Sequence, residues 1–272
     1  MRTDSVMARD TAGPDIDVGT ASGPRHADRH FGTRPHIPRV PIYDRQAATA
    51  IEEIDRWEGG VGWLAHSGER GRRASHALRG DDGVWVFDPV DAPGVDDLLA
   101  TVGEVAGVAV LSDYHARDAG AVARRHGVPV HVPEWFERVA ERVLAPVERF
   151  AGAIGDSGIR VRRYAPFPGW REGVAHRPAD GTLYVADALG SAPLYTVGEE
   201  RLGVYLLLRP FPPREVFAAA DPDRVLFGHG TGVFEDAADA LDDALAGARR
   251  RFPRALARNG AGQLRALVGA LG

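Results

Sequence analysis

One stretch of the sequence decides the fold: Val108-Ala109-Val110-Leu111-Ser112-Asp113-Tyr114-His115-Ala116-Arg117-Asp118. Its first part is an apolar run typical of a buried strand, and its second part is a cluster of polar and ionisable side chains. In open α/β sheets the loops at the carboxyl ends of strands carry most ligand-binding and catalytic groups. The sequence therefore predicts a candidate site in residues 112–118.

Strand and helix signals alternate on both sides of this stretch. Short apolar runs predict strands at residues 61–65, 84–87, 128–133, 183–186 and 225–227. Helical spacing of apolar residues predicts helices over residues 51–57, 95–102, 119–126 and 237–252. Residues 202–209 fit either a strand or another buried segment. The order strand, polar loop, helix, strand over residues 108–133 is a βαβ unit, so the predicted class is layered α/β.

Composition limits the chemistry of the site. The chain has 272 residues, no cysteine and 33 Lys+Arg, all of which are arginine. Without cysteine there are no disulfides or thiolate metal sites, so any metal must be held by His, Asp or Glu. Without lysine there is no Schiff base and no lysine general base. The net charge of -5 and the pI near 6.1 argue against a nucleic-acid surface.

The first residues differ in composition from the rest of the chain. Residues 1–38 are rich in Gly, Pro, Asp, Arg and His and lack apolar periodicity, so a disordered tail is predicted, followed by a single domain over residues 39–272. No run of about 18 apolar residues occurs, and the start of the chain lacks an apolar signal core. We therefore expect a soluble, cytoplasmic protein that does not bind membranes.

The polar run resembles the metal-binding loop of the metallo-β-lactamase superfamily, in which a strand ends in His-x-His-x-Asp-His. Here the pattern reads Asp-x-His-x-Arg-Asp, and only His115 matches a family histidine. Further family landmarks follow in order: the Asp-Pro strand (residues 83–91), the Pro-Gly-His loop (here Pro168-Gly169-Trp170), the bridging-aspartate strand (180–189) and the last histidine loop (225–230). The resemblance spans about residues 60 to 235. It implies a four-layer αββα sandwich with the site at one edge.

The resemblance also implies which residues line the site: Asp113, His115, Arg117, Asp118, Trp170, Asp187 and His229. The candidate metal ligands among them are His115, Asp187, His229, Asp113 and Asp118. Such a set is rich in oxygen donors and suits one divalent Zn, Fe or Mn ion. Trp170 stands at the family's third histidine and cannot coordinate, because its indole nitrogen only donates. His176 is the alternative third ligand.

Two functions remain open at this point. The first is a hydrolase with one metal ion that activates a water molecule. The second is a non-catalytic descendant, in which ion pairs of Arg117 with Asp187 or Asp118 replace the metal and the cleft binds a small-molecule ligand or a partner. The family cleaves thioesters, lactams, lactones, phosphodiesters and nucleic acids, so the resemblance predicts no substrate. No Gly-x-Ser-x-Gly elbow or phosphate-binding loop occurs, which argues against serine hydrolases and dinucleotide binding.

Overall fold

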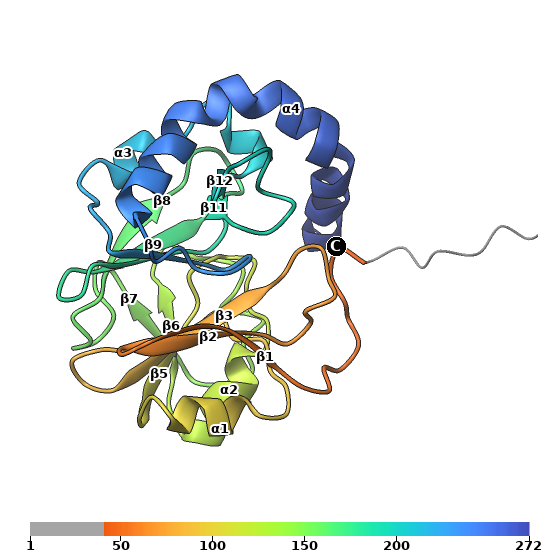
Figure 1. The fold of residues 1–272 in the computed structure, drawn as a ribbon. Coiled ribbons are helices and arrows are strands. Elements are labelled where there is room, and N and C mark those ends of the chain that lie inside the picture. Colours follow the sequence, from red (N-terminus) through yellow and green to blue (C-terminus); the bar gives the residue numbers. More distant parts are fainter. Residues whose placement is uncertain (1–40, 272) are drawn as a thin grey trace, which may run out of the picture. The chain divides into compact units, whose positions relative to one another are not determined.

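The computed structural model describes residues 41–271 and builds them around two facing β-sheets (Figure 1). The predicted disordered tail, residues 1–38, lies outside the described residues. The predicted α/β class is confirmed. Within residues 41–271, no helix combines the length and the apolar composition needed to cross a bilayer.

The larger sheet has seven strands that follow one another in chain order. They are β1 (Glu52–Trp57), β2 (Gly60–Leu64), β3 (Ala74–Arg79), β4 (Val84–Phe87), β5 (Val105–Ala109), β6 (Val130–Pro133) and β7 (Val147–Phe150). β1 to β4 pair antiparallel, whereas β4 to β7 pair parallel. Parallel neighbours need crossover connections. The short helices α1 (Val95–Ala100) and α2 (Ala119–His126) provide two of these crossovers.

The smaller sheet has four strands, in the order β13 (Arg224–Phe227), β10 (Thr182–Val185), β9 (Glu172–Arg177) and β8 (Arg160–Tyr164). A two-stranded ribbon, β11 (Leu189–Gly190) and β12 (Gly203–Val204), lies beside it together with η1 (Leu206–Leu208) and α3 (Arg214–Phe217). The last helix, α4 (Ala237–Leu271), has Pro253 inside it and curves over this half of the domain (Figure 1).

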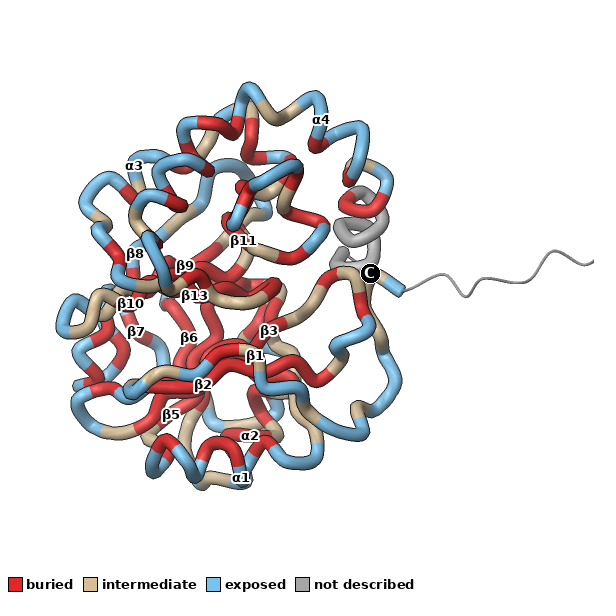
Figure 2. The backbone as a smooth tube through the Cα atoms, viewed as in Figure 1, coloured by how far each residue is buried: buried red, intermediate tan, exposed pale blue. Residues whose placement is uncertain are grey.

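Three groups of buried side chains lie between successive layers, and the alternation of strand residues assigns each side chain to one of them. Along β4, Val84 and Val86 face α1 and α2, whereas Trp85 and Phe87 face the second sheet. Along β13, Leu226 faces the first sheet, and its two neighbours face the group that includes α4. Figure 1 shows the resulting order of helices, sheet, sheet and helices, and Figure 2 shows the buried residues concentrated along the strands.

The helix predicted over residues 51–57 is wrong, because this segment forms β1. An irregularity between Glu53 and Asp55 shifts the pairing register with β2. The shift accompanies burial of Asp55, whose Oδ2 lies 2.9 Å from Nε2 of the buried His76 and accepts a hydrogen bond from the backbone of Gly232. The helical spacing of Ile51, Ile54 and Trp57 was therefore overridden by tertiary contacts.

A buried ion pair between Glu200 and Arg209 stabilises the loop that connects the ribbon strands β11 and β12. Both Glu200 and Arg209 are buried, and the guanidinium donates to the two carboxylate oxygens at 2.9 and 2.7 Å. Arg209 also donates to the carbonyl of Tyr195, and Glu200 accepts from the backbone of Val197. The pair therefore joins Arg209, which follows β12, to the loop between β11 and β12 that carries Tyr195.

Leu226→Ala is expected to lower the free energy of unfolding by about 2–5 kcal/mol, because it leaves a cavity between the two sheets. The matched control is Leu144→Ala at a side chain that is 79% exposed, where a change within about 0.5 kcal/mol is expected. Urea denaturation measures both values. Equal effects of the two substitutions would contradict the layered packing.

Glu200→Gln is expected to lower the free energy of unfolding by about 3–5 kcal/mol, because it leaves the Arg209 cation buried without its counter-ion. Glu53→Gln breaks the exposed pair with Arg56 and is expected to cost less than about 1 kcal/mol. Thermal denaturation of the two variants side by side gives the comparison. A harmless Glu200→Gln would show that this pair does not hold the loop.

Candidate metal centre

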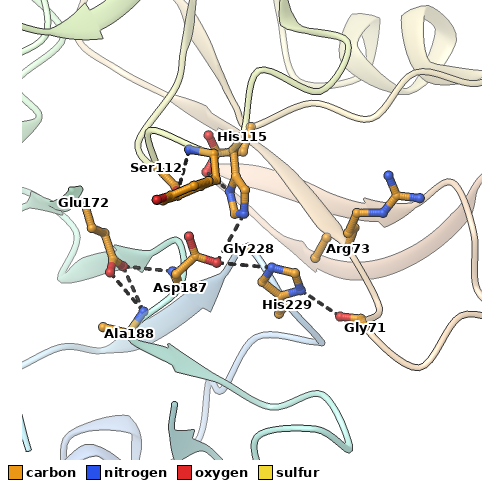
Figure 3. Close-up of polar contacts among 12 residues, drawn as sticks. Gly71, Arg73, Ser112, His115, Glu172, Asp187, Ala188, Gly228 and His229 are labelled. Carbon is orange, nitrogen blue, oxygen red and sulfur yellow. Dashed lines mark hydrogen bonds and ion pairs between the residues drawn. The ribbon is translucent and has the colours of Figure 1, made fainter. Parts of the chain in front are cut away.

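Three side chains from distant segments converge on one point. His115 follows β5, Asp187 follows β10 and His229 follows β13. Their ligand atoms all lie within 4.8 Å of one another. Nε2 of His115 is 3.2 Å and Nε2 of His229 is 3.3 Å from the same Oδ1 of Asp187 (Figure 3). The structure thus brings together three of the residues that the family resemblance implied as ligands.

The pairing of two strands places Asp187 beside His229. β10 and β13 are parallel, and Val185 pairs with Phe227. Asp187 and His229 each come two residues after that pair, so they leave the same edge of the sheet at equivalent positions. The register of the two strands is therefore sufficient to bring Asp187 and His229 together.

Both imidazoles turn Nε2 toward Asp187 because Nδ1 is engaged elsewhere. Nδ1 of His229 lies 2.8 Å from the carbonyl oxygen of Gly71, and Nδ1 of His115 lies 3.2 Å from Oδ2 of Asp88. A carbonyl or carboxylate oxygen only accepts hydrogen bonds, so each Nδ1 carries a proton. In the neutral imidazole the lone pair is then on Nε2, which is the orientation that a metal ligand requires.

Asp88 is the buried residue that holds His115. Its backbone has φ +45°, and its carboxylate accepts hydrogen bonds from the backbone of Leu111 at 3.0 Å and from the hydroxyl of Tyr184 at 2.6 Å. The Asp88-Pro89 sequence indicates a turn residue that accepts backbone hydrogen bonds, and the bond from Leu111 agrees with this. The contact with His115 was not predicted from the sequence.

The charges at the centre act on one another. Burial raises the pKa of Asp187, but the two histidines outweigh it and hold this pKa well below its usual value. Burial and Arg117 lower the pKa of His115, whereas Asp187 and Asp88 raise it, and the net shift is upward. Burial lowers the pKa of His229. In the metal-free protein, therefore, Asp187 is ionised and His229 is the histidine that more readily stays neutral.

Glu172, which the sequence did not single out, fixes the backbone of Asp187. Its buried carboxylate accepts hydrogen bonds from the backbone of Asp187 at 2.9 Å and of Ala188 at 3.0 and 3.1 Å (Figure 3). Trp170 donates its indole N–H to the same carboxylate at 3.1 Å. Burial and the charge of Asp187 raise the pKa of Glu172 to about 8. Trp170 thus contributes to the site by holding Glu172.

Two of the predicted ligands, Asp113 and Asp118, use their carboxylates to accept backbone hydrogen bonds outside the group of three. The Asp113 carboxylate accepts hydrogen bonds from the backbone of Arg138 at 2.9 Å and of Val139 at 2.8 Å, so it holds the segment after β6. The Asp118 carboxylate accepts from the backbone of Asp91 at 2.9 Å. Both were candidate ligands because they stand at the first and last histidine positions of the family motif, but the loop turns them toward backbone donors instead. The alternative third ligand, His176, lies on β9, outside the group of three.

Arg117 does not form the ion pairs predicted for it. Among the described residues its hydrogen bonds go to three backbone carbonyls: those of Ala74 and Asp88 at 2.7 Å and that of Gly228 at 2.9 Å. Its Nη2 also lies 3.4 Å from Nε2 of His115. The carboxylates of Asp118 and Asp187 are already occupied by other donors, so Arg117 ties backbone segments together while leaving its positive charge beside His115.

Aromatic rings cover the side of the centre that carries His229. The ring of Tyr195 stacks on His229 with 5.6 Å between centroids, and Tyr43 lies 6.1 Å away. Tyr205 contacts Tyr195 at 5.7 Å and Trp170 at 5.2 Å. Burial and the charge of Asp187 raise the pKa of Tyr43 to about 12, so its hydroxyl stays protonated. The sequence showed no signal for the three tyrosines, because they come from segments far apart in the chain.

Arg117→Ala is expected to lower the free energy of unfolding by several kcal/mol, since three carbonyl acceptors lose a charged donor worth about 1.5–3 kcal/mol each before relaxation. Arg117→Lys is expected to recover only part of this loss, because one ammonium lacks the guanidinium's planar fork. The control is Arg163→Ala on the exposed face of β8. Urea denaturation in which Arg117→Ala matched Arg163→Ala would exclude this function of the guanidinium.

Solved structures with the same fold exist, although no protein-family model and no curated protein sequence matches the chain. A metallo-β-lactamase from Hirschia baltica is 12% identical, with 74% of this chain and 98% of that chain covered and a TM-score of 0.52. One from Pontibacter korlensis is 14% identical, with 72% and 99% covered and a TM-score of 0.53. The DIM-1 metallo-β-lactamase exposed to ceftazidime is 11% identical, with 75% and 100% covered and a TM-score of 0.54.

Proposed function

Since the chain has the metallo-β-lactamase fold, we propose that it is a metal-dependent hydrolase with one divalent ion held by His115, Asp187 and His229. One observation carries this proposal: two imidazoles with engaged Nδ1 atoms turn Nε2 toward the same carboxylate oxygen. Two imidazoles and one carboxylate, all of which can bind a cation, are thereby brought together inside the protein. The net charge of -5 favours a small-molecule substrate over nucleic acid.

The donor set fits such an ion. Two imidazole nitrogens and one carboxylate oxygen are three protein ligands, the number that catalytic zinc sites use while keeping a position open for water or substrate. The same set suits divalent Fe or Mn. When bound, the ion supplies Lewis acidity and lowers the pKa of a water molecule.

The other residues orient the ligands and limit the site to one ion. Asp88 and the carbonyl of Gly71 hold the two imidazole rings, and Glu172 holds the backbone at Asp187. Arg117 stands where the family has a metal-binding aspartate and brings a permanent charge. A second divalent ion there would be repelled by this cation. The protonated hydroxyl of Tyr43 adds a hydrogen-bond donor near the carboxylate of Asp187.

A specific contact also supports a second candidate function, that of a non-catalytic binding protein. Nη2 of Arg117 lies 3.4 Å from Nε2 of His115, so a fixed positive charge sits beside a metal ligand. If this charge weakens metal binding enough, His115 instead shares a proton with Asp187 and the cleft binds a small-molecule ligand without chemistry. The amount of bound metal separates the two functions.

Protein purified without a histidine tag is expected to bind one equivalent of Zn²⁺, Fe²⁺ or Mn²⁺. His115→Ala, His229→Ala and Asp187→Asn are each expected to weaken this binding by more than about 100-fold, because each removes one of three ligands that the centre needs. Isothermal titration calorimetry and elemental analysis measure affinity and stoichiometry.

The matched control is His176→Ala, which removes a histidine from the neighbouring strand β9 and is expected to leave affinity unchanged. The proposed metal centre would be contradicted if the parent protein bound no divalent ion, or if His176→Ala weakened binding as strongly as His229→Ala. Either result would favour the second candidate function, a non-catalytic binding protein.

A further inference from the structure

We infer that residues 41–44, here called the arm segment, and the Glu69–Arg73 ion pair form the positioning element for His229, so that a segment far from the ligands in sequence belongs to the metal centre. The inference rests on the proposed function. It concerns how one ligand is held, a function that neither the ligand set nor the likeness to metallo-β-lactamases assigns to these residues.

The arm segment is attached to the turn at residues 69–73 by backbone hydrogen bonds. The backbone N–H of Arg70 donates to the carbonyl of Pro41 at 2.9 Å, and that of Gly71 donates to the carbonyl of Ile42 at 2.9 Å. Ile42 also packs against the buried group around Tyr195. The turn is therefore supported from outside by this strip of backbone.

The ion pair of Glu69 and Arg73 attaches the arm segment to the turn at residues 69–73. The Glu69 side chain is 0% exposed, and its carboxylate accepts from Nε of Arg73 at 2.9 Å and from Nη2 at 2.8 Å. The same carboxylate accepts from the backbone of Asp44 at 2.9 Å, while Nη2 of Arg73 donates to the carbonyl of Asp44 at 2.6 Å. Burial opposes the ionised form of Glu69, but Arg73 outweighs it and lowers the pKa of the carboxyl group.

The turn at residues 69–73 contacts His229 directly through its backbone. The carbonyl of Gly71 lies 2.8 Å from Nδ1 of His229 (Figure 3), and the carbonyl of Arg72 accepts from the backbone of Gly230 at 2.8 Å. Arg73 forms an antiparallel bridge with His229 itself. The position of the Gly71 oxygen, and with it the proton on Nδ1, therefore depends on the turn.

Tyr43 of the arm segment completes the element. Its ring lies 6.1 Å from the ring of His229 and beneath the guanidinium of Arg73. A Cβ atom on Gly71 would come within 2.3 Å of this ring and 2.8 Å of the carbonyl of Ile42, so any side chain there would displace the arm segment. Gly68, in the same turn region, has nothing within 4 Å of such an atom.

The other imidazole is held independently, which makes the inference testable. His115 takes its orientation from Asp88, which belongs neither to the arm segment nor to the turn at residues 69–73. Loosening the turn should therefore disturb one ligand and leave the other in place. Loss of a partner that orients a metal ligand typically weakens metal binding about 10–100-fold.

The experiment compares full-length Gly71→Ala and Glu69→Gln with the parent and with Gly68→Ala as the matched control. In metal-free protein, with the pH raised until the ¹⁵N chemical shifts show both histidines to be neutral, the same shifts report which nitrogen of each histidine carries the proton. We expect His229 to be protonated on Nδ1 in the parent and in Gly68→Ala, and to become a mixture of tautomers in the other two. His115 should stay protonated on Nδ1 in all four, and Zn²⁺ affinity should fall about 10–100-fold in Gly71→Ala and Glu69→Gln.

An unchanged His229 tautomer together with parental Zn²⁺ affinity in both variants would overturn the inference, as would equal disturbance of His115 and His229. If either variant does not fold, Arg73→Lys replaces it. This change keeps the charge but cannot hold both Glu69 and Asp44, so a smaller shift in the same direction is expected. If the parent binds no Zn²⁺, the proposed function fails and the tautomer comparison alone decides the inference.

Discussion

The structure depends on the junction where the two sheets meet at one edge. The backbone of Ala74, at the start of β3, donates to the carbonyl of Gly228, just after β13. Arg117 donates to the carbonyls on both sides of this contact and to that of Asp88. Because Ala74, Asp88 and Gly228 are buried, their carbonyls need such a donor. The loops that carry the ligands leave the sheets at this junction.

The junction also sets the electrostatics of the centre. Three carboxyl groups are gathered there, those of Asp88, Glu172 and Asp187, and each is held by donors from the backbone, a hydroxyl, an indole or an imidazole. A buried carboxylate is tolerated only when it is paired and hydrogen-bonded in this way. Arg117 is directed mainly to backbone carbonyls, so Asp187 has the two histidines as its side-chain partners in the part of the chain that the structure describes. The same arrangement that stabilises the junction thus brings together the three ligands of the proposed metal centre.

Part of the fold and of the site could be predicted from local patterns. Helix α2 was placed over residues 119–126 because its apolar spacing is regular, and Gly127 ends it with a left-handed backbone. β1 was mistaken for a helix because Ile51, Ile54 and Trp57 fall at helical spacing, whereas the burial of its Asp55 is explained by distant partners, His76 and the backbone of Gly232. Asp113 was taken for a ligand because it stands at the first histidine of the family motif, whereas its backbone partners lie about 25 residues further along.

The sequence by itself determined the α/β class and the exclusion of cysteine and lysine chemistry, because these follow from periodicity and composition. Through the family resemblance it also gave five candidate ligands, of which three come together. Only the tertiary structure decided which carboxylates reach the centre and what holds each ligand. Glu172, Tyr195 and the turn at Gly71 show no local signal, since they act through contacts between segments distant in the chain. A side chain's neighbours in sequence constrain its backbone, whereas its chemistry depends on which distant donors and acceptors the packing of the sheets brings to it.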